Sequence, residues 1–158
     1  MHQLTAQSSC FKALIVTLTL FGLATSAVAG EFYEKDGVAI RGYDPVAYFT
    51  DQKPVQGSQS FTSEYQGSLF RFASAAHRDA FAAHPEKFAP QYGGFCAFGT
   101  ALGYKAAVDP EAFTIVGDRL YLNYSLKVRA KWQEDIPGHI RKADHNWPDV
   151  QKTTKVVE

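Results

Sequence analysis

The chain has 158 residues, and its 16 Lys and Arg balance 16 Asp and Glu, so the formal net charge is zero with neutral His. This balance, without any basic block along the chain, argues against nucleic acid as a partner. Only Cys10 and Cys96 are cysteines, too few for a disulfide framework or a closed structural zinc site.

The N-terminus is expected to be a signal peptide, residues 1–29. Lys12 is the only charged residue before position 31, the apolar run "ALIVTLTLFGLA" follows it, and "AVA" at residues 27–29 has the form that signal peptidase cleaves. The run is shorter than the ~20 residues that span a bilayer, so we expect no stable membrane anchor. The prediction is a periplasmic or secreted protein cleaved near Ala29, whose mature chain keeps Cys96 as its single cysteine.

The elements from residue 31 onward are short. The stretch 31–58 is rich in Gly, Pro and Asp and predicts turns with short extended pieces. Tyr43-Asp44-Pro45 predicts a turn, because the residue before proline is held out of the helical region. "VAYF" after it is compatible with a short strand or a single helical turn.

Two hairpin-plus-helix units are then predicted. β-rich runs flank Gln66-Gly67, and Ser74 is a good N-cap for the helix "AAHRDAFAAH" that Pro85 ends. The same pattern returns around Gly117-Asp118, with Ser125 before "LKVRAKWQEDI". A shift of 51 positions brings Leu69 onto Leu120 and Ser74 onto Ser125.

The C-terminal segment "PGHIRKADHNWPDV" predicts one more short helix, and the polar tail 151–158 is expected to fray. The fold class is therefore α+β: a single small domain, residues 30–150, of short antiparallel β-hairpins packed with three or four helices.

Cys96, in "QYGGFCAFG", and His77, on the inner face of the first predicted helix, are the candidate chemical residues. Three interpretations of the thiol stay open: an inert core residue, a metal ligand and a nucleophile. One Cys with one His suits a soft ion such as copper, and a catalytic Cys-His pair would use the same residues. A candidate pocket comprises Tyr43, Asp44, Tyr92 and Tyr121. The sequence has no HExxH, CxxC, GxSxG or phosphate-binding Gly-Lys-Ser/Thr motif, and no catalytic residue is assigned.

Several separated motifs resemble secreted bacterial proteins of the YHS domain family. They are "GYDPVAYF", "FRFASAAHRDAFAAHPEKFAPQYGGFCAFG" and "LYLNYS" followed by "DIPGHIRKADHNWP", which together extend from about residue 37 to 150. The resemblance implies a small treble-clef-like core, here with a C-terminal extension. It also implies metal binding or sensing, in association with heavy-metal and copper transport, and no established enzymatic activity.

The sequence departs from the metal-binding relatives at their cysteines. Where the relatives carry Phe-Cys-Ser-x-x-Cys, this chain has Ala73 and then His77; where they carry Asp-Pro-x-Cys, it has Ala47. The resemblance therefore implies a metal site reduced to His77, with Cys96 as a replacement ligand.

The leading hypothesis is an exported module that binds or senses a transition metal, copper or zinc, through Cys96 and His77. The alternative is a metal-free interaction or small-ligand module that has lost the family's cysteine ligands, and a thiol-dependent redox protein ranks third. The expected partners are metal-transport or envelope proteins, and we expect a monomer or weak dimer.

Overall fold

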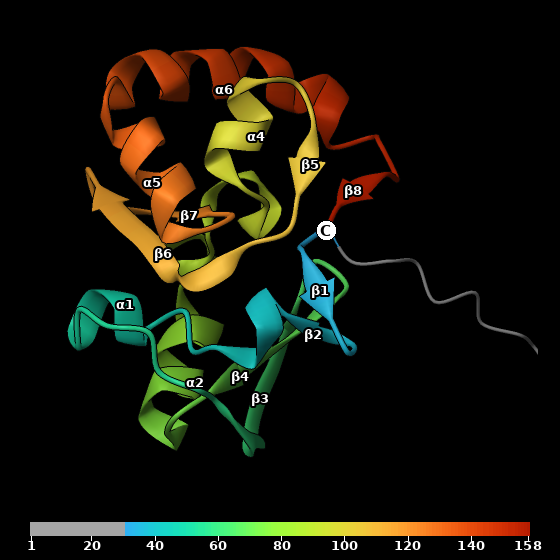
Figure 1. Ribbon diagram of the computed structural model, residues 1–158. Coiled ribbons are helices and arrows are strands. Elements are labelled where there is room, and N and C mark those ends of the chain that lie inside the picture. Colours follow the sequence, from blue (N-terminus) through green and yellow to red (C-terminus); the bar gives the residue numbers. More distant parts are fainter. Residues whose placement is uncertain (1–30) are drawn as a thin grey trace, which may run out of the picture.

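The computed structural model describes residues 31–158. The predicted signal peptide, with Cys10, lies outside the described residues. Within them the α+β prediction is confirmed: six α-helices pack with eight short strands arranged in four two-stranded sheets (Figure 1). The helices outnumber the three or four expected because single turns after Asp44, His84 and Cys96 are also helical.

The first half of the described chain contains a small N-terminal ribbon and the first hairpin-plus-helix unit. Its elements are β1 Glu34–Lys35, β2 Val38–Ala39, a 3₁₀ turn Ile40–Gly42, α1 Ala47–Thr50, β3 Ser58–Tyr65, β4 Ser68–Phe72, α2 Ala75–Ala83 and α3 Pro85–Phe88. The "VAYF" segment is thus a helical turn rather than a strand.

The second half contains the second unit and the C-terminal helix. Its elements are a 3₁₀ turn Gln91–Gly94, α4 Ala97–Ala101, β5 Lys105–Ala106, β6 Asp109–Val116, β7 Arg119–Asn123, α5 Leu126–Gln133, α6 Ile136–Val150 and β8 Val156–Val157. Figure 1 shows the two units one above the other, α1, α2, β3 and β4 below and α4, α5, β6 and β7 above.

The two units repeat one another in detail, as the shift of 51 residues predicts. Strands β3 and β4 pair antiparallel, as do β6 and β7, and the register slips between Ser58 and Thr62 in one hairpin and between Asp109 and Phe113 in the other. Each hairpin turns through two residues of positive φ, at 66–67 and 117–118. Both slips and both turns are therefore related by the same shift.

Equivalent serines start the helices of the two units. The side chain of Ser74 accepts a hydrogen bond from the His77 amide, and that of Ser125 accepts one from the Val128 amide. Each helix then covers its own hairpin with one large aromatic residue, Phe81 in α2 and Trp132 in α5, which are both 0% exposed.

One buried cluster contains residues of both units and joins them to each other. Tyr48 of α1 lies in it with Leu120 and Leu122 of β7 and with Cys96, and the Tyr48 hydroxyl donates a hydrogen bond to the carbonyl of Pro110 (3.1 Å). The two units consequently share a core rather than only a surface contact.

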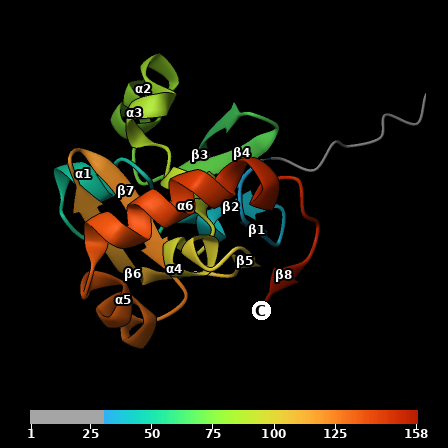
Figure 2. The ribbon, with the colours of Figure 1, turned by 90° about the horizontal axis from the view of Figure 1, so that it is seen from above.

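The C-terminal segment is more ordered than the sequence indicated. Helix α6 has 15 residues, begins at the N-cap Asp135 and packs on α4 (Figure 2). The tail beyond it does not fray, because β8 pairs parallel with β5 and the Lys105 ammonium donates hydrogen bonds to the carbonyls of Gln151 (2.9 Å) and Thr153 (2.8 Å). Across residues 31–158, the helices are all too short or too polar to traverse a lipid bilayer.

Candidate functional site

Asp44 is the hub of the first unit. Its side chain lies just before α1 and is 0% exposed, so its carboxylate needs internal partners. Oδ1 accepts hydrogen bonds from the amides of Val46 (2.8 Å) and Ala47 (3.3 Å), which tie the carboxylate to the start of α1.

The second oxygen of Asp44 links this turn to the hairpin and to α2. Oδ2 accepts a hydrogen bond from the Ala73 amide (2.8 Å), directly after β4, and lies 2.7 Å from Nδ1 of His77. A carboxylate accepts only, so His77 Nδ1 carries the hydrogen in this contact. One carboxylate thus connects three segments that are far apart in the sequence.

The other ring nitrogen of His77 faces outward. The His77 side chain is 20% exposed, and Nε2 lies 3.5 Å from the hydroxyl oxygen of Thr50. That hydroxyl has nearer acceptors in Asp51 Oδ1 (2.8 Å) and the Val46 carbonyl (3.2 Å). Asp44, His77 and Thr50 therefore follow one another in the order of an acid–base–nucleophile triad, but they do not form one. The Thr50 hydroxyl hydrogen has nearer acceptors than His77 Nε2, so the histidine does not activate the hydroxyl. His77 Nε2 therefore remains able to bind an ion.

Cys96 occupies a different kind of environment. It is 1% exposed and is the N-cap of α4, where its sulfur accepts hydrogen bonds from the amides of Gly99 (3.4 Å) and Tyr124 (3.3 Å). The thiol also lies 3.7 Å from Oδ1 of the buried Asn123. Burial raises the pKa of the Cys96 thiol, although these amides act in the opposite direction. A buried thiol of raised pKa suits an inert residue better than a nucleophile.

Cys96 plays a part in the second unit that is similar to that of Asp44 in the first, although the 51-residue shift brings Asp44 onto the neighbouring Phe95. Cys96 is the N-cap of α4, and Asp44 accepts hydrogen bonds from the amides at the start of α1. Both also accept a hydrogen bond from the residue that follows their hairpin, Ala73 for Asp44 and Tyr124 for Cys96. Ala73 and Tyr124 are related by the 51-residue shift. The same shift brings His77 onto Val128, which is apolar and packs against the shared core. The second unit therefore has a helix-capping side chain, Cys96, but no histidine at the position equivalent to His77.

The predicted pocket residues do not surround one cavity. Asp44 is fully buried, and Tyr43 lines a surface pocket beside Arg41. Tyr92 and Tyr121 belong to the core of the second unit, with ring centroids 5.9 Å apart, and the Tyr92 hydroxyl donates a hydrogen bond to Asp144 (2.8 Å).

The structure gives His77 and Cys96 separate surroundings. Within residues 31–158 their hydrogen-bond partners are different, and no group of three or more His, Cys, Asp or Glu side chains is placed to hold a metal ion. The Thr50 hydroxyl near His77 Nε2 is a hard oxygen ligand rather than sulfur, so these two residues do not by themselves fit a soft-metal site. A joint Cys96–His77 metal site stays a prediction.

Sequence reasoning missed the central role of Asp44 and the presence of two arginines, Arg41 and Arg71, at one pocket. The available signal for Asp44 was the Asp-Pro pair before an apolar turn, a typical helix-start pattern.

Comparison with known families supports the resemblance for one part of the chain. Residues 46–92 match the family model of the YHS domain, which supports the YHS family for this segment. The match covers the first unit, from α1 to the 3₁₀ turn after α3, and includes His77 but not Cys96. No curated protein and no solved structure matches the chain.

Proposed function

We propose that this protein is an exported, YHS-type binding module in which the Asp44–His77 hydrogen bond replaces a structural metal as the cross-link of the fold. In this proposal the module binds a small ligand or a partner and performs no catalysis. The single observation that carries it is the set of groups around the Asp44 carboxylate.

These groups coincide with the positions where the metal-binding relatives carry cysteines. Ala47 and Ala73 stand at two of those positions and donate their backbone amides to Asp44, while His77 stands at the third and donates Nδ1. A metal in the relatives would join the helix start, the end of the hairpin and the second helix. Here a buried carboxylate joins the same three segments by hydrogen bonds to a charged group, which are the stronger kind in proteins.

The test is a measurement of metal content and of its effect on stability. Protein purified without an affinity tag should contain far less than one transition-metal ion per chain, and a chelator should leave its thermal unfolding midpoint unchanged. Stoichiometric metal whose removal lowers the midpoint would overturn the proposal.

A second candidate function, transition-metal binding, is favoured by the orientation of His77. A carboxylate on Nδ1 fixes the ring so that Nε2 is the free donor, which is the arrangement common in metal-binding histidines. If Cys96 and His77 bind copper or zinc, titration should give about one ion per chain, and Cys96→Ser and His77→Gln should each abolish uptake. Equal uptake in Cys96→Ser and wild type would remove the thiol from the site.

A further inference from the structure

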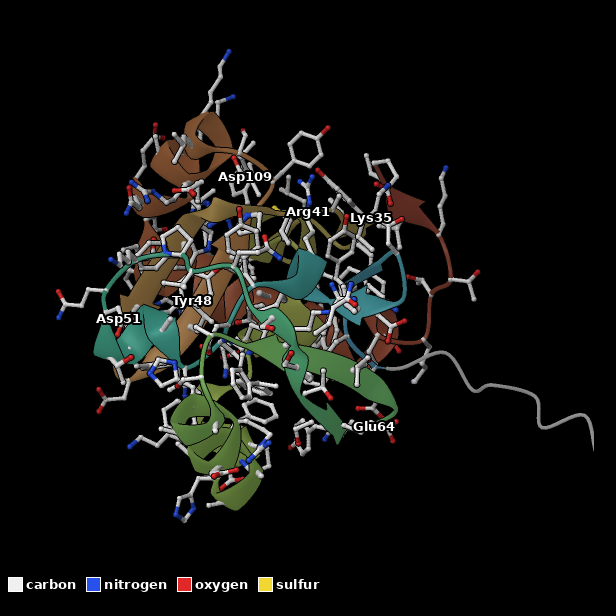
Figure 3. The ribbon with its side chains drawn as sticks, turned by 90° about the horizontal axis from the view of Figure 1, so that it is seen from below. Lys35, Arg41, Tyr48, Asp51, Glu64 and Asp109 are labelled. Carbon is white, nitrogen blue, oxygen red and sulfur yellow. The ribbon has the colours of Figure 1, made fainter. Side chains whose placement is uncertain are left out.

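A polar pocket of about 590 Å³ lies where the N-terminal ribbon, the first hairpin and the start of β6 meet. Its lining includes three cationic side chains, Lys35, Arg41 and Arg71, and two acidic ones, Asp36 and Asp109. Figure 3 shows Lys35, Arg41 and Asp109 side by side on this face. A pocket of this volume is large enough for a small organic ligand.

Arg71 is held at the pocket by the alternation of β4. Its neighbours Phe70 and Phe72 are fully buried on the core face, so Arg71 projects from the opposite face. Gly57 leaves room for it, since a Cβ at that position would come within 2.7 Å of the Arg71 Cβ. The arginine is thus packed in place by a backbone that passes unusually close.

The guanidinium of Arg71 has an unmet hydrogen-bonding need. Its Nε is buried and has no hydrogen-bond partner among residues 31–158, and no carboxylate of these residues lies within 4.0 Å of the side-chain nitrogens. Buried donors in folded proteins are nearly always satisfied, so Arg71, which lines the pocket, has hydrogen-bonding capacity that no described residue uses.

Arg41 adds a second unpaired guanidinium from a strained backbone. Ile40 and Arg41 have φ of 42° and 59°, a conformation that a β-branched residue such as Ile40 rarely adopts. Arg41 is exposed, lines the pocket, and likewise has no carboxylate within 4.0 Å in the described part of the chain. Strain of this kind persists where the surrounding structure requires a particular side-chain position.

The remaining charges leave the two arginines available. Lys35 lies 3.8 Å from Glu158, which offsets its charge. Asp109 accepts a hydrogen bond from the Glu111 amide (3.0 Å), and among residues 31–158 neither Asp109 nor Asp36 forms an ion pair with Arg41 or Arg71. Guanidinium groups bind carboxylate and phosphate oxygens in a bidentate geometry that an ammonium group does not offer.

We infer that this pocket binds a small molecule through a carboxylate or phosphate group held between Arg41 and Arg71. The inference rests on the proposed function, since it names the ligand class and the place of binding for the module. It uses none of the groups around Asp44, so the two proposals can fail separately.

The experiment titrates chelator-treated protein with inorganic phosphate and, separately, with succinate, followed by calorimetry at low salt. Saturable binding of either anion with a dissociation constant below about 10 mM supports the inference, and the tighter one names the group that is recognised. Arg41→Gln, at an exposed position, should weaken binding by about tenfold or more, and Arg71→Gln by at least as much. Arg141→Gln, an exposed arginine on α6, is the matched control and should bind like wild type.

Two results would overturn the inference: no saturable binding of either anion, or equal affinity in wild type and Arg41→Gln. Circular dichroism of each variant separates lost binding from lost folding, and Arg41→Gln alone decides the matter if Arg71→Gln does not fold. Stoichiometric metal in the untreated protein, with a midpoint that falls when the metal is removed, would overturn the proposed function but not this inference. The anion titration uses chelator-treated protein and different residues, so its result would still decide whether the pocket binds an anion.

Discussion

Replacing Asp44 by Asn tests the cross-link with the smallest change of shape. The Asn amide keeps one acceptor oxygen, but its NH₂ group must face either the amides of Val46 and Ala47 or the Ala73 amide and His77. Whichever orientation it takes, at least one backbone N–H then points at another donor.

The expected loss follows from those contacts. Each hydrogen bond to a charged acceptor contributes about 1.5–3 kcal/mol, and two are removed on one side of the carboxylate. His77 can recover part of this by changing its tautomer, so we expect Asp44→Asn to lower the free energy of unfolding by about 3 kcal/mol. In a domain of this size the thermal midpoint should fall by about 10 °C.

Urea denaturation followed by tryptophan fluorescence measures this difference. The matched control is Asp51→Asn, because Asp51 is exposed and, among residues 31–158, its side chain accepts a hydrogen bond from the Thr50 side chain alone, so its effect should stay within about 0.5 kcal/mol. The double variant Asp44→Asn/His77→Gln should cost less than the sum of the two single changes, since the pair is in direct contact. A loss in Asp44→Asn that is no larger than in Asp51→Asn would refute the reasoning.

Three further predictions concern pH, the thiol and the core. Burial raises the pKa of Tyr48 and Tyr92, so the contribution of these two tyrosines to stability should be constant below the unfolded pKa near ~10 and fall above it by about 1.4 kcal/mol per pH unit for each. Tyr92→Phe should reduce the loss of stability per pH unit above ~10 in urea unfolding, and an unchanged loss would exclude Tyr92 as its source. A disulfide reagent at alkaline pH should modify Cys96 about 100-fold more slowly in folded than in urea-unfolded protein, and similar rates would show an accessible thiol. Trp132→Ala and Phe81→Ala should each cost about 3–5 kcal/mol, and a much smaller loss at either would mean that its helix does not seal the hairpin.

Local chemistry in the sequence was enough to predict the two units. Gly67 and Gly117 allow the positive φ that tight hairpin turns require, and Ser74 and Ser125 supply an acceptor for the first free amides of the helices that follow. Because these requirements act within a few residues, the repeat could be recognised from spacing alone.

The C-terminal segment shows where local patterns were insufficient. A polar tail after Gln151 predicts fraying, yet Lys105, 46 residues earlier, binds the carbonyl of Gln151 and helps to hold the strand that follows. A pairing of this kind depends on where the remainder of the fold places the partner, which short-range propensity does not encode.

The same distinction between local and long-range contacts applies to the candidate site. The sequence by itself determined that His77 lies on a helix capped by Ser74, that alanine stands at positions 47 and 73, and that Cys96 follows paired glycines. Only the tertiary structure decided that His77 meets Asp44, that Cys96 is a buried cap, and that Arg41 and Arg71 share a pocket. Helix caps and turns are made by neighbours in the chain, whereas these contacts join segments that lie far apart in the sequence and meet only in the folded chain.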